Sequence, residues 1–187
     1  MVQICAETLT LEQFLQQPET RPIREYRDGV ILEKPMPEGK HSTIQTELAT
    51  AINMALKPPK IARAWSELRC TFGGKSIVPD ISVVVWERIP RDMDGKIANS
   101  FEIAPDWAIE IVSPDQGQTA IVKKILRSLD YGTQMGWLID PQEETLFTYA
   151  PHQQPQCYDE PGQVISVPSF ASPFQLTVAQ LFAWLVD

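Results

Sequence analysis

Two acidic residues, Asp80 and Glu110, lie in segments of the sequence that are otherwise typical of buried β-strands. Asp80 precedes the apolar run 81–85, and Glu110 lies inside the apolar run 107–112. Side chains alternate between the two faces of a strand, and the neighbours of Glu110 on its own face are apolar. An unpaired ionised carboxylate is costly there, so each acid must be protonated, hydrogen-bonded, paired with a cation or bound to a metal.

Metal binding is the most specific of these alternatives. Without a cation, two carboxylates held close together repel, and one of them takes up a proton. Mg²⁺ favours a few carboxylate oxygens plus water, and the backbone carbonyl of Ile111 could add a ligand. A metal held in this way polarises a phosphodiester and activates a water, while a nearby lysine offsets developing negative charge. Lys124, at the flank of the helical apolar stripe Ile121, Ile125 and Leu129, is the candidate for that lysine.

The two acids can converge only if the strands that carry them are neighbours. We predict these strands over 77–86 and 107–112, with an exposed excursion over 87–100 and a helix from Gln118 to about Tyr131 that crosses back over the sheet. The other predicted elements are a short helix over 11–16 capped by Thr10 and Gln13, a β-hairpin over 23–33 around Asp28-Gly29, a helix over 42–56, strands over 61–72, 137–139, 145–149 and 164–167, and a closing helix over 178–185.

Composition indicates one globular domain over residues 1–187. The chain is 43% hydrophobic and 21% charged, and no apolar run reaches the ~20 residues of a membrane helix. The N-terminus lacks the pattern of a secretory signal, and the three cysteines are far apart, which favours reduced thiols. We therefore expect a cytoplasmic protein without membrane contact.

Charge is unevenly distributed along the chain. The formal net charge is −8, which argues against broad attraction to phosphate backbones. All 16 Lys and Arg residues lie between Arg21 and Arg127. The basic residues within 57–75 form either a phosphate-facing patch or a solvated edge, and the sequence leaves both readings open.

An ordered set of motifs resembles the Uma2-like proteins (DUF820), a bacterial family abundant in cyanobacteria and assigned to the PD-(D/E)XK nuclease superfamily. The motifs are Asp28-Gly29, His41 at the start of a helix, Val78-Pro79-Asp80, the run 109–114 (Ile-Glu-Ile-Val-Ser-Pro), and the run 136–141 (Gly-Trp-Leu-Ile-Asp-Pro). The resemblance implies an α/β (α+β) fold, with a restriction-endonuclease-like mixed sheet core flanked by helices and an N-terminal β-hairpin.

The resemblance also implies an activity, namely cleavage of DNA by a homodimer that depends on Mg²⁺, with Mn²⁺ as an alternative metal. It places the two motif acids at Asp80 and Glu110. The motif lysine normally follows two residues after the second acid, where this chain has Val112, and the resemblance moves that role to Lys124. Two functions stay open: a metal-dependent endonuclease, or a catalytically impaired protein of the same fold that binds nucleic acid or a protein partner.

Five further residues are secondary candidates for the site, and each has a simpler structural alternative. Glu47 could complete a metal site or be a solvated helix residue. Glu67 could approach Asp80 or pair with a nearby basic residue, and His41 could contact substrate or hold a structural hydrogen bond. Gln116 and Gln118 could donate to phosphate or to Glu110, or cap the following helix.

Overall fold

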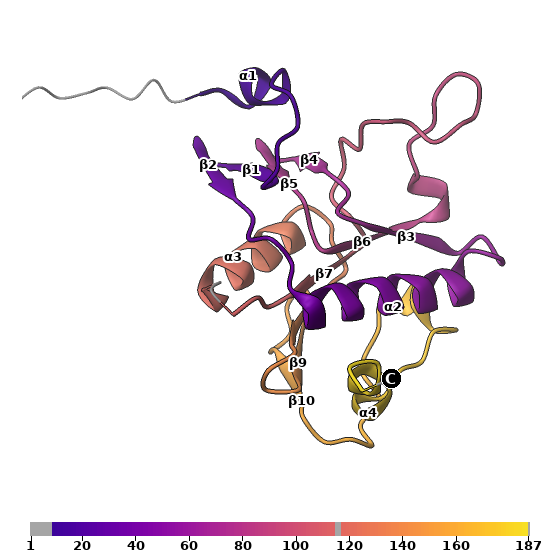
Figure 1. The fold of residues 1–187 in the computed structure, drawn as a ribbon. Coiled ribbons are helices and arrows are strands. Elements are labelled where there is room, and N and C mark those ends of the chain that lie inside the picture. Colours follow the sequence, from indigo (N-terminus) through magenta and orange to yellow (C-terminus); the bar gives the residue numbers. More distant parts are fainter. Residues whose placement is uncertain (1–8, 115–116, 187) are drawn as a thin grey trace, which may run out of the picture.

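The computed structural model describes residues 9–114 and 117–186 of the chain (Figure 1). Two β-sheets form its framework, and helices cover the larger one. The elements in chain order are α1 (Leu11–Leu15), β1 (Arg24–Arg27), β2 (Val30–Glu33), α2 (Gly39–Leu56), β3 (Ala62–Ser66), β4 (Cys70–Phe72), β5 (Lys75–Ile77), β6 (Ile81–Val85), a 3₁₀ turn (Trp86–Arg88), β7 (Trp107–Ile111), α3 (Gln118–Leu129), β8 (Met135–Asp140), β9 (Thr145–Tyr149), β10 (Gln156–Tyr158), a second 3₁₀ turn (Ser169–Ala171) and α4 (Val178–Ala183).

The larger sheet has six strands in the order β10-β9-β8-β7-β6-β3. Its central pair, β7 and β8, is parallel, and the other pairs are antiparallel. A parallel pair needs a crossover connection, which α3 supplies. At Gly136 on β8, an added Cβ would lie 2.2 Å from Ile125 Cγ2 on α3. Only glycine therefore allows α3 to pack this closely on the strand.

The smaller sheet has four strands in the order β2-β1-β5-β4, and all its pairs are antiparallel. The β1–β2 hairpin turns at Asp28 and Gly29, which both have positive φ, as a tight two-residue turn requires. The hairpin of β4 and β5 turns in the same way at Gly73 and Gly74.

The two faces of the larger sheet have different cores. On one face, buried residues of α2 and α4 pack with strand residues that include Trp107 and Trp137, whose rings meet edge-to-face at 4.7 Å. On the other face, Ile121 and Ile125 of α3 pack with Leu138 of β8. Glu110 shares the α3 face, since it alternates along β7 with the α2-facing Ile109 and Ile111.

The predicted α+β class with flanking helices is confirmed, with the difference that the strands form two sheets. The predicted strand 61–72 is in fact β3 and β4, which belong to different sheets and are separated at Glu67, where φ is +51°. The predicted strand 77–86 begins only at Ile81, so Asp80 stands immediately before β6. In the described part of the chain, no helix is long and apolar enough to cross a membrane.

The C-terminal third contains one wrong assignment. The predicted strand 164–167 is not formed, because Val164 makes a single isolated bridge to Thr177. The edge strand there is β10, which lies in the polar stretch 150–162 and carries no apolar alternation that the sequence could reveal.

Candidate active site

Strand pairing places Asp80 and Glu110 opposite each other on one face of the larger sheet. Ile81 of β6 pairs with Ile109 of β7. When this antiparallel register is extended by one residue, Asp80 lies opposite Glu110. Opposed residues of such a pair project from the same face. Asp80 Oδ2 accepts a hydrogen bond of 2.7 Å from the backbone N–H of Ile111, which ties the two chain segments together. Both acids are about 2% exposed.

Lys124 from α3 reaches Glu110 across this face. Its Nζ lies 2.8 Å from Glu110 Oε1 and donates to Glu110 Oε2 at 3.0 Å. The same Nζ lies 2.7 Å from Glu25 Oε1 of β1 and donates to the backbone oxygen of Val78 at 3.1 Å. An ammonium group has three N–H donors, so these acceptors use the capacity of Lys124 fully.

Asp80 has two basic neighbours of its own. Lys34 Nζ lies 2.6 Å from Asp80 Oδ1, and His41 Nε2, near the start of α2, lies 3.2 Å from the same oxygen. Lys34 also donates to Val78 O at 3.1 Å, so this one carbonyl accepts from both lysines. Gln45 of α2 donates to the backbone oxygen of Asp80 at 2.8 Å and fixes the approach to β6.

These groups form a charge cluster, defined here as Glu25, Asp80 and Glu110 with Lys34, Lys124, Arg27 and His41. Burial raises the pKa of Glu110 to about 7; the charge of Asp80 acts in the same direction and Lys124 opposes it. Burial also disfavours the charged form of Asp80, but Lys34 and His41 hold its pKa below the usual value. Adjacent carboxyls with opposite pKa shifts are typical of functional sites.

Lys124 and Glu25 stay charged for a related reason. Burial alone would lower the pKa of Lys124, yet Glu110 and Glu25 raise it above its usual value. Burial would raise the pKa of Glu25, yet Lys124 lowers it. A second cation, Arg27, lies 3.3 Å from Glu25 Oε2.

Carboxylate oxygens such as those of the two opposed acids are ligands that Mg²⁺ prefers. Asp80 Oδ1 and Glu110 Oε1 are buried and, among the described residues, have no partner with hydrogen-bond geometry, although both lie within ion-pair distance of lysines. No group of three or more His, Cys, Asp or Glu side chains within residues 9–114 and 117–186 is arranged to hold a metal. Mg²⁺ commonly uses one or two carboxylates and keeps several waters, whereas a structural zinc needs four protein ligands. Two carboxylates are therefore too few for a structural zinc site, and they are a number of ligands that Mg²⁺ commonly uses.

The structure brings two of the five secondary candidates, His41 and Glu67, into contact with Asp80, and a third, Gln118, lies at the start of α3. His41 contacts the Asp80 side chain, as given above. The backbone N–H of Glu67 donates to Asp80 O at 3.1 Å, while its carboxylate pairs with Arg21 at 3.4 Å. Gln118 donates to Asp140 Oδ2 at 3.0 Å and so anchors the start of α3.

The other two secondary candidates are not in the site as the structure describes it. Glu47 is exposed on α2, because it lies two positions after the inward-facing Gln45, and two positions turn a helix by more than half a revolution. Gln116 lies outside the described residues.

Sequence reasoning missed Glu25 and Lys34. Glu25 is 3% exposed and accepts from the Val78 N–H at 2.8 Å. The pattern that singles out Glu110, an acid among apolar residues of a strand, is absent around Glu25, because the β1 sequence Arg-Glu-Tyr-Arg is mostly polar. Lys34 follows β2 and gives no local signal, since its partner Asp80 is 46 residues away along the chain.

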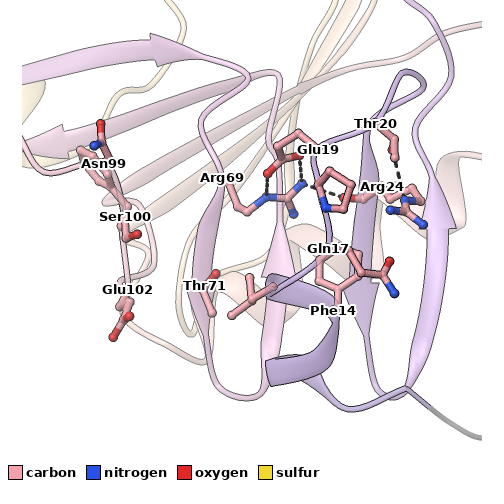
Figure 2. A pocket seen from close by; sticks show the side chains of 13 residues that line it. Phe14, Gln17, Glu19, Thr20, Arg24, Arg69, Thr71, Asn99, Ser100 and Glu102 are labelled. Carbon is pink, nitrogen blue, oxygen red and sulfur yellow. Dashed lines mark hydrogen bonds and ion pairs between the residues drawn. The ribbon is translucent and has the colours of Figure 1, made fainter.

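A separate cavity of about 370 Å³ lies between α1, β4 and the segment 99–102 (Figure 2). The main ion pair in its lining is already satisfied, because Arg69 donates to both carboxylate oxygens of Glu19 at 2.7 Å. None of the charge cluster lines this cavity. The chemistry of the two opposed acids therefore belongs to the sheet face and not to this hollow.

Comparisons with known proteins identify the family and the fold. The family model Uma2, described as "Putative restriction endonuclease", matches residues 11–179. The crystal structure of "a putative nuclease belonging to DUF820" from Anabaena variabilis is 58% identical and superposes with a TM-score of 0.93, covering 94% of this chain and 98% of that chain. No curated protein matches the chain.

Proposed function

This chain belongs to the Uma2 family, and from that premise we propose that it is a magnesium-dependent endonuclease that hydrolyses phosphodiester bonds in DNA. The observation that carries the proposal is the pair of buried, opposed acids, Asp80 and Glu110, each with one oxygen that lacks a hydrogen-bond partner among the described residues. A fold stabilised only by burial would place apolar residues at these two positions.

Asp80 and Glu110 are the residues that would hold Mg²⁺, with the carbonyl of Ile111 as a third ligand. Bound there, the ion supplies Lewis-acid polarisation of a phosphodiester and a lowered pKa for the attacking water. Mn²⁺ prefers the same oxygen ligands and is the natural alternative.

The surrounding residues hold these acids in place. The Ile111 N–H fixes Asp80 Oδ2, which leaves Oδ1 directed towards Lys34 and His41. Lys124 contacts both oxygens of Glu110 and opposes the effect of burial, which raises the pKa of that group to about 7. Such prearranged groups need no reorganisation when charge develops on the substrate.

A plasmid-nicking assay tests the proposed function. Purified protein is incubated with supercoiled DNA and Mg²⁺ or Mn²⁺, beside Asp80→Asn, Glu110→Gln and the matched control Glu47→Gln, which removes an exposed carboxylate. We expect nicking by the native chain and by the control, and none by the two site variants or in EDTA. Equal nicking by the site variants would assign the activity to a contaminant.

The alternative function gives a different result in the same experiment. A catalytically impaired member of the fold would retain DNA in a mobility-shift assay without nicking under either metal, and an interaction protein would do neither. The homodimer stays a prediction, measured by light scattering coupled to size exclusion.

A further inference from the structure

Lys34 enters the charge cluster from the connection between β2 and α2, which joins the smaller sheet to the long helix (Figure 1). Its backbone N–H donates to Ile23 O at 2.8 Å, so the base of the residue is fixed to the start of β1. Most of the residues that follow it, 35–40, are exposed. The side chain thus reaches inward from a surface segment, and it is itself about 10% exposed.

The two lysines of the cluster are held very differently. Lys124 sits within α3, is 6% exposed, and contacts two carboxylates and one carbonyl. Lys34 has one directed hydrogen bond, to Val78 O, and one ion contact, to Asp80 Oδ1, and that contact lacks hydrogen-bond geometry. Lys34 can leave by losing two contacts, whereas departure of Lys124 would remove the ion partner of buried Glu110 and leave buried Glu25 with Arg27 alone.

Apart from His41, the cluster contains as many basic as acidic side chains. The acidic ones are Glu25, Asp80 and Glu110, and the basic ones are Lys34, Lys124 and Arg27. A divalent cation at Asp80 adds two positive charges next to the Lys34 ammonium, which is repelled. A phosphodiester brings one negative charge to the same place and gives a displaced ammonium a new partner.

We propose that Lys34 is a displaceable cation that holds Asp80 in the metal-free protein and contacts the substrate phosphate once metal has taken Asp80. Lys124 is then a positioning residue for Glu110 and not the lysine that meets the substrate. This assignment rests on the proposed nuclease function and names the residue that supplies its cation.

Mn²⁺ titration without DNA tests the first half of the proposal. Free Mn²⁺ is measured by electron paramagnetic resonance for the native chain, Lys34→Met, Lys34→Gln and the control Lys40→Met, which removes an exposed lysine on α2. The glutamine side chain can still donate to Val78 O, so this variant controls for misfolding caused by loss of that hydrogen bond. We expect both Lys34 variants to bind Mn²⁺ at least about tenfold more tightly, and the control to match the native chain. Unchanged or weaker binding in the Lys34 variants would overturn the proposal.

Cleavage at saturating Mn²⁺ tests the second half. We expect the Lys34 variants to nick plasmid about 100-fold more slowly than the native chain, and Lys34→Arg to recover part of the rate. Tighter metal binding with an unchanged or faster rate would overturn the proposal, because Lys34 would then only compete with metal. Failure of the proposed function looks different: the native chain and Asp80→Asn would both show no Mn²⁺ binding.

Discussion

Replacing Glu110 with glutamine should make the protein more stable at alkaline pH, although it removes a contact with Lys124. Glutamine has nearly the same shape as a protonated glutamic acid, and its amide oxygen still accepts a hydrogen bond from the lysine. Burial raises the pKa of Glu110 to about 7, so the native fold prefers the neutral form that glutamine imitates.

The sign and size follow from proton linkage. The folded protein retains the Glu110 proton up to about pH 7, whereas the unfolded chain releases it near the ordinary value of 4.5. Stability is therefore lost as pH rises between these two values, and the loss is complete above the higher one. Since one pKa unit corresponds to about 1.4 kcal/mol, ionised Glu110 costs roughly 3 kcal/mol at pH 8.

Urea unfolding at pH 5 and pH 8 measures this cost. Tryptophan fluorescence reports the transition, because Trp107 and Trp137 are fully buried. The free energies of unfolding of Glu110→Gln and of the native chain are compared in metal-free buffer. The advantage of the variant over the native chain should be larger at pH 8 than at pH 5 by roughly 2 to 3 kcal/mol. The control Glu47→Gln, which alters an exposed carboxylate, should show no such increase. A difference that stays constant or shrinks as pH rises would refute the reasoning.

Three further predictions concern Lys124, Gly136 and Cys70. Lys124→Met removes the ion partner of buried Glu110 and one of the two cations beside buried Glu25, and it should lower the free energy of unfolding by about 3 to 5 kcal/mol in urea titrations. Gly136→Ala places a Cβ 2.2 Å from Ile125 Cγ2 and should cost about 1 to 3 kcal/mol, seen as a lower melting temperature. Cys70 is buried, and burial raises the pKa of its thiol to about 11, so a disulfide reagent at pH 8 should modify the exposed Cys157 quickly and Cys70 only after unfolding.

Matched variants make these three outcomes decisive. Gly162→Ala, where an added Cβ meets nothing within 4 Å, should leave the melting temperature unchanged, and an equal effect at both glycines would contradict the packing argument. Lys123→Met removes an exposed neighbour of Lys124 and should have little effect. The thiol experiment is done in a Cys5→Ser background, and rapid modification of both remaining cysteines would contradict the burial of Cys70.

Alternation along the strands was enough to find the central acids from sequence. Glu110 stood out because its neighbours on both faces are apolar, and the apolar stripe on α3 placed Lys124 at the helix flank. Both signals are local, and local periodicity survives in the folded chain because each strand and helix must present one face to the core.

Pairing between distant segments was much harder to predict. The division into two sheets depends on a turn at Glu67 with positive φ, which no residue pattern there announces. Glu25 and Lys34 join the charge cluster only because the β1–β2 hairpin packs near β6 and α3, a contact between parts of the chain 46 or more residues apart. For Glu47 the structure shows the simpler alternative, an exposed helix residue, since the inward position on α2 belongs to Gln45.

Anomalous diffraction from crystals soaked in Mn²⁺ tests most directly whether Asp80 and Glu110 form a shared metal site. We predict a peak within ligand distance of a carboxylate oxygen from each acid, with Lys34 Nζ no longer beside Asp80. A fully soaked crystal with no peak between these carboxylates, or with Mn²⁺ bound only elsewhere, would contradict the assignment.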